Sequence, residues 1–313
     1  MGKRIGVVGC GRWGSKHLSA LQQIAEQASV DAIVACDVHR IALEQAKSMG
    51  FEVHGDPTNL VETFQLDAVI VATPNDSHFE LGKRFLMEGV DVFLEKPLAT
   101  TFDHASSLVS IAIQEGKILK SGFLLRFHPC IVDVKQQIRR GRIGAIQAIH
   151  YRKKSARQDD GQSHALDSLA IHGVDLAEFL LDGQTPLRIS EVTGSRRSAR
   201  LTLEYPHQVE IRIDVGWDSE ENIAEVEIIG ADKSIRVSLQ DHHQYSIGGD
   251  THEPKEMEHQ RTPLEGVLLD FLSGESPSIA SSTGSILRTI KCIEQARLQL
   301  NASGRLNTRE LKG

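Results

Sequence analysis

Residues 3–14 read KRIGVVGCGRWG, an apolar strand that runs directly into a glycine-rich turn. Gly9, Gly11 and Gly14 fit the spacing G-x-G-x-x-G. In such a turn the first glycine allows the tight bend, the second lets the backbone approach a pyrophosphate, and the third lets helix and strand pack closely. The helix that follows directs its free N–H groups at the phosphates. The stretch therefore predicts a dinucleotide-binding unit at the start of the chain.

An acidic residue follows the second predicted strand. Asp37 comes directly after the apolar residues 32–36 and 23 residues after Gly14. A carboxylate that accepts hydrogen bonds from the adenine ribose is expected about 20 residues beyond the glycines. An acid there repels a 2′-phosphate and favours NAD over NADP, whereas Arg40 nearby is able to accommodate that phosphate. The alternative is a turn without a ligand, in which Asp37 only caps a helix.

Short apolar runs and helix-period segments alternate over residues 1–121. We predict strands at 5–8, 32–36, 68–72, 90–94 and 118–120, and helices at 16–28, 41–49, 77–88 and 102–115. This order implies right-handed crossovers and a doubly wound parallel sheet, which is an α/β fold of the Rossmann type.

The rhythm changes over residues 122–313, which we predict to form a second, α+β domain. Its predicted strands alternate apolar and polar residues, as is typical of antiparallel strands covered on one face. The expected elements are helices at 128–140, 165–181, 264–272 and 285–300 (with caps at Ser282 and Thr283), strands at 145–154, 209–217 and 235–239, a hairpin turn at 230–233, and an exposed loop at 252–261.

The composition narrows the class of protein. The 313 residues are 40% hydrophobic and 25% charged, and 35 Lys and Arg against 42 Asp and Glu give a net charge of −7. This balance argues against a protein that coats nucleic acid or an anionic membrane, and no apolar run approaches the ~18 residues of a membrane span. Four widely spaced cysteines indicate reduced thiols in a cytoplasmic protein. The first strand leaves no room for a signal peptide.

Two turns follow neighbouring predicted strands, at the sheet edge where open α/β folds bind ligands. Thr73-Pro74-Asn75, with His78 close behind, follows one strand, and Glu95-Lys96-Pro97 follows the next. Pro97 restricts the turn and gives Lys96 a defined direction, which suits acid–base work beside a nicotinamide. The alternatives are ordinary turn and cap residues at 73–75 and a solvated lysine at 96.

The predicted helix at 165–181 carries a candidate pair of polar residues. His172 and Asp175 are three residues apart and share a helix face, where a carboxylate is able to orient an imidazole. A helical histidine that only packs is the alternative. In the strand at 145–154 and its exit, Arg152, Lys153, Lys154 and Arg157 are candidates to hold a substrate phosphate, or else to form a solvated, charged strand edge.

Together these stretches resemble the family of glucose-fructose oxidoreductase, inositol dehydrogenase and rhizopine-catabolism oxidoreductases, over nearly the whole chain. The motifs that carry the resemblance are the glycine turn with Arg12 and Trp13, Asp37, Thr73-Pro74-Asn75 with His78, Glu95-Lys96-Pro97, Arg126-Phe127-His128-Pro129, Gly141-Arg142-Ile143-Gly144, and His172 with Asp175. The resemblance implies a Rossmann domain followed by a domain with a large, mainly antiparallel sheet that often serves in oligomer contacts. A homo-oligomer is therefore expected.

The resemblance also implies a chemistry, the reversible oxidation of a secondary alcohol on a sugar or cyclitol. Lys96 matches the family's active-site lysine and His172 the histidine commonly paired with it. Residues 169–172 look most like members that act on UDP-N-acetylglucosamine at its 3-hydroxyl. The predicted cofactor-binding residues are Gly9, Gly11, Arg12, Trp13, Gly14, Asp37, Thr73, Pro74, Asn75, His78, Glu95 and Lys96; the predicted substrate residues are Arg126, Arg152, Ser168 and Asp175; no metal ligand is predicted.

One position departs from the family pattern. Ser168 stands four residues before His172, where the family commonly has Asp, and the nearest acid is Asp167. On a regular α-helix, which turns about 100° per residue, Asp167 cannot simply substitute, so Asp175 is a candidate to orient His172. The leading hypothesis is an NAD-dependent dehydrogenase. The rivals are a cofactor-binding regulatory protein without turnover and an enzyme of the same fold that reduces a non-sugar ligand.

Overall fold

The computed structural model describes residues 2–158, 163–254, 261–274 and 283–310, with side chains as far as residue 302. Packing divides the chain into two compact units, Met1–Leu124 with Arg261–Leu287, and Leu125–Gln260 with Arg288–Gly313. The sequence suggests a single boundary after residue 121, whereas the first unit also contains a segment from near the end of the chain.

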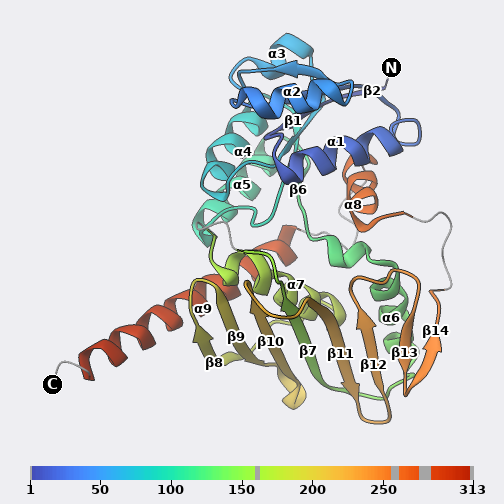
Figure 1. Cartoon of the computed structure of the whole chain (residues 1–313), viewed down its shortest axis with the longest axis vertical. Helices are drawn as coiled ribbons and strands as arrows, with labels where there is room; N and C mark the ends of the chain where they lie inside the picture. Colours follow the sequence, from blue (N-terminus) through green and yellow to red (C-terminus); the bar gives the residue numbers. More distant parts are fainter. Residues whose placement is uncertain (1, 159–162, 255–260, 275–282, 311–313) are drawn as a thin grey trace. The chain divides into compact units, whose positions relative to one another are not determined.

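The first unit is built on a six-stranded sheet in which every pairing is parallel. Its strand order, β3-β2-β1-β4-β5-β6 (Figure 1), is that of a dinucleotide-binding doubly wound fold, as predicted. The strand interiors are almost wholly buried, which explains their near-continuous apolar sequence. The strands are β1 (Lys3–Val8), β2 (Val30–Cys36), β3 (Glu52–His54), β4 (Ala68–Val71), β5 (Asp91–Leu94) and β6 (Leu119–Ser121).

The predicted helices of residues 1–121 appear in the predicted order, and the structure adds one short strand and one short helix to them. Neither the three-residue β3 nor the five-residue α3 is predicted, because each is too short to show a periodic pattern. Helix α8 packs beside α1 (Figure 1) and begins with a capping box between Thr262 and Glu265. The helices are α1 (Arg12–Ile24), α2 (Arg40–Ser48), α3 (Leu60–Phe64), α4 (His78–Met87), α5 (Phe102–Gln114) and α8 (Pro263–Leu272), with a 3-10 turn η1 (Asn75–Ser77).

The second unit contains an eight-stranded, mainly antiparallel sheet in the order β14-β13-β12-β11-β7-β10-β9-β8 (Figure 1). The β7–β10 pairing is parallel. The predicted hairpin turn is confirmed, because the Gly230 amide donates to the Lys233 carbonyl at 3.0 Å between β11 and β12. The strands are β7 (Ile146–Lys154), β8 (Arg188–Gly194), β9 (Ser198–Glu204), β10 (Glu210–Gly216), β11 (Ile223–Gly230), β12 (Ser234–Ser238), β13 (Tyr245–Ile247) and β14 (Asp250–His252).

Helices pack on one face of this sheet. Gly173 brings α7 close to β7, since a Cβ there would lie 2.7 Å from Tyr151 Cδ1. The helical segments are η2 (Leu124–Phe127), α6 (Pro129–Arg139), a π-helical turn η3 (Leu166–Ala170), α7 (Ile171–Leu180), a 3-10 turn η4 (Pro206–Gln208) and α9 (Thr283–Glu310), which belongs to this unit from Arg288 onward. Residues 255–260 of the expected loop and the expected cap Ser282 lie outside the described residues.

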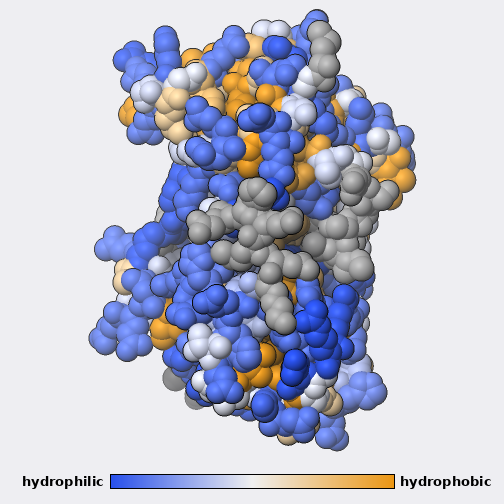
Figure 2. Space-filling view, turned by 90° about the vertical axis from the view of Figure 1, so that its right-hand side faces the viewer, coloured by the Kyte–Doolittle hydropathy of each residue, from blue (hydrophilic) through white to orange (hydrophobic). Residues whose placement is uncertain are grey.

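One face of the protein is mainly hydrophilic, and its cysteines are reduced. Hydrophilic side chains dominate the face seen in Figure 2. All four cysteines are buried free thiols. Over the residues that the structure describes, no helix combines the length and apolarity needed to cross a membrane.

Candidate active site

The three glycines of the glycine turn differ in how much space surrounds each Cβ position. Gly9 has a φ of +88°, and a Cβ there would lie 2.8 Å from the Ala72 carbonyl carbon, so this position needs glycine for both conformation and space. A Cβ on Gly14 would lie 1.8 Å from the Gly9 carbonyl oxygen, which places α1 against the end of β1. A Cβ on Gly11 would meet nothing within 4 Å. The turn is therefore closed behind Gly9 and Gly14 and open over Gly11, the position at which a pyrophosphate is expected.

Asp37 fastens the end of β2 to this turn. Its Oδ2 accepts from the Cys10 amide at 2.7 Å and its Oδ1 accepts from the His39 amide at 2.8 Å. Each carboxylate oxygen has further lone pairs, so the group is able to accept from ribose hydroxyls as well. Burial, reinforced by the Asp37 charge, raises the pKa of the Cys10 thiol to about 12 and keeps it protonated.

Arg12 and Trp13 begin helix α1. The Trp13 ring is half-buried and lies against two cations, with Lys16 Nζ 4.6 Å and Arg12 Cζ 5.7 Å from the ring centroid. Arg12 itself is exposed. The first turn of the helix thus presents positive charge beside the open position over Gly11.

His78 joins the two turns at the sheet edge. It is fully buried at the start of α4, with Nε2 2.9 Å from the Thr73 carbonyl oxygen and Nδ1 2.8 Å from the Pro97 carbonyl oxygen. The Ser77 hydroxyl donates to Thr73 Oγ1 at 2.7 Å. Burial lowers the pKa of His78, against the opposing effect of the two carbonyls. The histidine predicted to contact the cofactor is therefore held between backbone carbonyls and braces the turns around it.

Glu95 and the cis peptide Lys96–Pro97 form the second of these turns. Glu95 is buried, and its Oε1 lies 2.7 Å from Nε2 of His17 on α1. Its Oε2 accepts from the Lys96 amide at 3.2 Å. His17 is a functional candidate that the sequence does not reveal. Its position on the buried face of α1 is a signal only for packing, and nothing in the sequence links residues 17 and 95.

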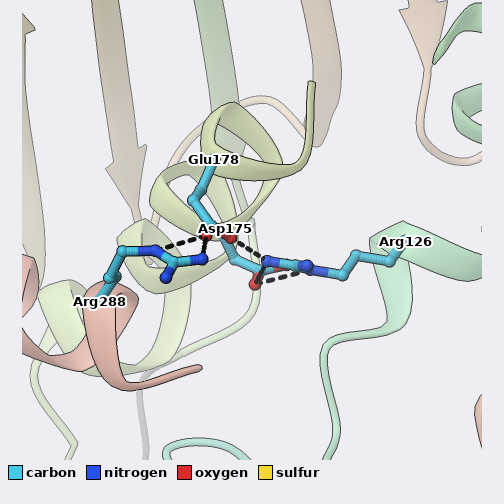
Figure 3. Close-up of polar contacts among 4 residues, drawn as sticks. All are labelled: Arg126, Asp175, Glu178 and Arg288. Carbon is cyan, nitrogen blue, oxygen red and sulfur yellow. Dashed lines mark hydrogen bonds and ion pairs between the residues drawn. The ribbon is translucent and has the colours of Figure 1, made fainter. Parts of the chain in front are cut away.

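Asp175 lies in an ion cluster with the buried Arg126 and Glu178 and the partly exposed Arg288 (Figure 3). Arg126 Nε donates to both Asp175 oxygens at 3.0 Å, and Arg126 Nη2 donates to Asp175 Oδ1 at 2.7 Å. The Asp175 carboxylate is thus held by a guanidinium. That Asp175 also orients His172 stays a prediction. Burial raises the pKa of Asp175 to about 6 despite the opposing Arg126 charge.

Burial separates Arg126 and Asp175 from the predicted catalytic histidine and from Ser168. Arg126 is 3% and Asp175 1% exposed, whereas His172 and Ser168 are half-buried. The structure thus brings Arg126 and Asp175 together inside the second unit. Their contact with a substrate stays a prediction.

A π-helical turn precedes His172. The Ile171 amide bonds to the Leu166 carbonyl, five residues back, so Leu166–Ala170 do not follow the 100° rotation of an α-helix. The prediction of a regular α-helix over this stretch is therefore wrong. The argument that Asp167 cannot replace the family's Asp at position 168 assumed a rotation of about 100° per residue, and it does not hold here. Asp167 is ion-paired with Arg297 of α9.

Arg152 lies on the polar face of the large sheet. Its Nη1 donates to Glu225 Oε1 at 2.7 Å on the neighbouring β11, and Lys154 on the same face is paired with Asp214 of β10. Lys153 points to the opposite face, where burial lowers its pKa. These contacts match the alternative of a strand face carrying ion pairs. A phosphate-binding role for Arg152 stays a prediction.

A family model described as "Oxidoreductase family, NAD-binding Rossmann fold" matches residues 3–123. Residues 3–123 therefore resemble the NAD-binding domain of that oxidoreductase family, in agreement with the motifs and with the strand order of the sheet. Over the described residues, no group of three or more His, Cys, Asp or Glu side chains is placed to hold a metal.

Individual relatives extend this result. Inositol 2-dehydrogenase 2 of Saccharopolyspora erythraea is 33% identical over 188 residues, 58% of this chain and 54% of the relative, so the chain spans about half the length of the curated relatives it matches.

Two solved structures share the fold of the whole chain. UDP-N-acetylglucosamine 3-dehydrogenase GnnA from Acidithiobacillus ferrooxidans has a TM-score of 0.82 at 20% identity, with 96% of this chain and 99% of that one covered. GenD2 from gentamicin A biosynthesis, in complex with NAD, has a TM-score of 0.79 at 19% identity, with 93% of each chain covered.

Proposed function

We propose that the protein oxidises a secondary alcohol of a sugar, nucleotide-sugar or cyclitol reversibly, with NAD as the hydride acceptor. The observation that carries this proposal is the glycine turn. Gly11 faces open space at the N-terminus of α1, beside a carboxylate fixed on two backbone amides. This arrangement fits a pyrophosphate and an adenine ribose.

The names of the relatives favour a polyhydroxylated substrate. The curated relative acts on inositol and one structural neighbour on UDP-N-acetylglucosamine, by their names. Both names denote dehydrogenases, so the class of reaction is the same although the substrates differ.

Lys96 and His172 are the residues to which we assign the proton chemistry. The bound NAD supplies the acceptor for the hydride, which leaves the carbinol carbon with its bonding electron pair. Either His172 takes the hydroxyl proton while the Lys96 ammonium stabilises the developing alkoxide, or a neutral Lys96 amine takes the proton and becomes the ammonium itself. The brace made by His78 and Glu95 supports this role, because a proton-transfer group must be held within hydrogen-bonding reach of its partner.

NAD rather than NADP is the proposed cofactor. The Asp37 carboxylate is buried and fixed beside the turn, where it repels a 2′-phosphate. Arg40, the candidate to neutralise that phosphate, is ion-paired with Glu44 on the exposed surface of α2. Comparing the two dissociation constants tests this assignment, and tighter NADP binding would overturn it.

The experiment that tests the function is a substrate screen followed by one variant. UDP-sugars, sugar phosphates, free hexoses and inositols are offered with NAD while nicotinamide absorbance is recorded. With the best substrate, Lys96→Met should lower kcat by about 10²–10⁴-fold, a much larger effect than its effect on the Kd for NAD. Lys83→Met, at an exposed position of α4, serves as the matched control.

Two outcomes would reject the proposal. Near-normal turnover by Lys96→Met removes the lysine from the mechanism. NAD binding without turnover of any compound in the screen supports the regulatory, non-enzymatic alternative instead.

A further inference from the structure

Glu95 and His17 form a buried pair that connects two parts of the first unit. His17 lies in the second turn of α1, the helix that follows the glycine turn, and is 0% exposed. Its Nε2 lies 2.7 Å from Glu95 Oε1, and its ring meets the edge of Phe93 with centroids 5.4 Å apart. The pair therefore fixes α1 to the end of β5.

The second oxygen of Glu95 reaches the residue proposed to be catalytic. Oε2 accepts from the Lys96 amide at 3.2 Å. Gly122, directly after β6, makes room for the carboxylate, because a Cβ at position 122 would lie 2.9 Å from Oε2. The carboxylate of Glu95 thus lies between α1, the end of β5 and the residue that follows β6.

Hydrogen-bonding chemistry defines the state of this pair. A carboxylate only accepts, so Nε2 of His17 carries the proton, while Nδ1 has no partner among the described residues. Burial raises the pKa of Glu95, but the His17 hydrogen bond and the charges of His17 and Lys96 outweigh burial and lower it. Glu95 is consequently an anion at neutral pH.

We infer that His17 and Glu95 are positioning residues that hold the backbone of Lys96 in register with helix α1 and hence with the dinucleotide turn. This inference rests on the proposed function, since it gives the lysine a reason to be held. The turn is also held on its other side, where His78 binds the Pro97 carbonyl. A displacement of about 1 Å in a reacting group can lower a rate by ~100-fold, so a fixed backbone at Lys96 has a direct kinetic value.

Kinetics with three variants test the inference. His17→Leu removes the donor and should lower kcat at least about tenfold, while the Kd for NAD changes less than threefold. His17→Gln keeps a donor toward Glu95 and should recover most of kcat. Lys120→Met is the matched control, because it breaks another buried ion pair of this unit, with Asp270, without touching Glu95; its kcat should stay within threefold of the parent.

Amide hydrogen exchange at Lys96 gives a readout that needs no substrate. His17→Leu should accelerate exchange of this amide, whereas Lys120→Met should not. If His17→Leu keeps normal kcat and normal protection at Lys96, the inference is wrong even though the dehydrogenase assignment stands. If the unaltered protein turns over nothing in the screen, the proposed function fails, and the exchange measurement still decides whether the pair holds the backbone.

Discussion

The three glycines of residues 9–14 have three separate physical reasons to be glycine. The sequence pattern predicts these reasons, and the spaces around the Cβ positions agree with each of them. Gly9 combines a positive φ with a neighbouring carbonyl, Gly14 faces the Gly9 oxygen, and Gly11 faces open space. This site could be predicted from local sequence because the glycine spacing belongs to one short strand–turn–helix unit, although Gly9 also meets Ala72 at the end of the neighbouring strand β4.

Alanine at two of these positions should separate folding from cofactor binding. Gly11→Ala should leave the free energy of unfolding within about 1 kcal/mol of the parent and weaken NAD binding, because its Cβ occupies space intended for the ligand. Gly14→Ala should destabilise the protein by about 3 kcal/mol or more, since its Cβ would overlap the Gly9 carbonyl oxygen. Urea unfolding and NAD titration measure both effects. Equal stabilities of the two variants would contradict this interpretation of the turn.

Ion pairs and hydrogen bonds between residues far apart in the sequence could not be predicted from it. Asp175 binds Arg126, which is 49 residues away, and its spacing from His172 does not reveal this partner. His17 and Glu95 are 78 residues apart. Periodicity identifies the face of a helix on which a residue lies. It does not identify which charge from another element arrives at that face.

At the scale of elements, strong periodic segments were predictable and local irregularities were not. The alternating strand β10 and the helix α5 lie close to their predicted bounds. The π turn Leu166–Ala170 was missed, because a single extra residue in a helical turn leaves the hydrophobic pattern almost unchanged. That residue nevertheless alters which side chains stack above His172.

Helix α6 begins at a buried histidine that should make the second unit sensitive to acid. His128 is the N-cap of α6, is 1% exposed and stacks edge-on against His242 at 4.6 Å. Burial and then the His242 charge lower the pKa of His128 to about 4. Between pH 6.5 and 4 the histidine is protonated when unfolded and neutral when folded, so its contribution to stability is complete above pH 6.5 and is lost as the pH falls through 4.

The contribution that disappears is about 3 kcal/mol, from the difference between an ordinary pKa of 6.5 and a folded value of about 4. Urea unfolding of the parent and of His128→Phe across this pH range measures it, and the variant should lose that part of the acid dependence. His243→Gln, at an exposed position of the same unit, should keep it. An unchanged acid slope in His128→Phe would refute the assignment.

At the scale of the whole molecule, each of the two units is built from segments that are not consecutive in the sequence. The sequence predicts helix α8 but assigns it to the second domain, because adjacent residues are expected to fold together. In the structure α8 packs on α1 in the first unit, and Asp270 of α8 accepts from Lys120 of β6, 150 residues earlier. The unit to which α8 belongs is decided by contacts with residues far away in the sequence, and such contacts leave no local sequence pattern.

Removing the Asp270 carboxylate should therefore destabilise the NAD-binding unit. Lys120 is 3% exposed and donates to the Asp270 carbonyl at 2.9 Å and to its carboxylate. Asp270→Ala leaves this ammonium buried without its counter-charge, which should cost about 3–5 kcal/mol. The double variant Lys120→Met/Asp270→Ala should recover most of that loss.

The two tryptophans allow the unfolding of each unit to be followed separately. Trp13 belongs to the first unit and Trp217 to the second, so in a Trp217→Phe background fluorescence follows the unfolding of the first unit alone. An Asp270→Ala variant whose Trp13 transition matches the parent would show that α8 does not stabilise the first unit.

The double duty of Asp37 has a consequence for protein engineering. The two carboxylate oxygens of Asp37 accept hydrogen bonds from the Cys10 and His39 amides. Replacing Asp37 to admit a coenzyme with a 2′-phosphate would remove these bonds and loosen the turn proposed to bind the pyrophosphate. A redesign of coenzyme choice should therefore leave Asp37 in place and begin at the exposed neighbour Val38, where a new cation can be added beside Arg40 without breaking these hydrogen bonds.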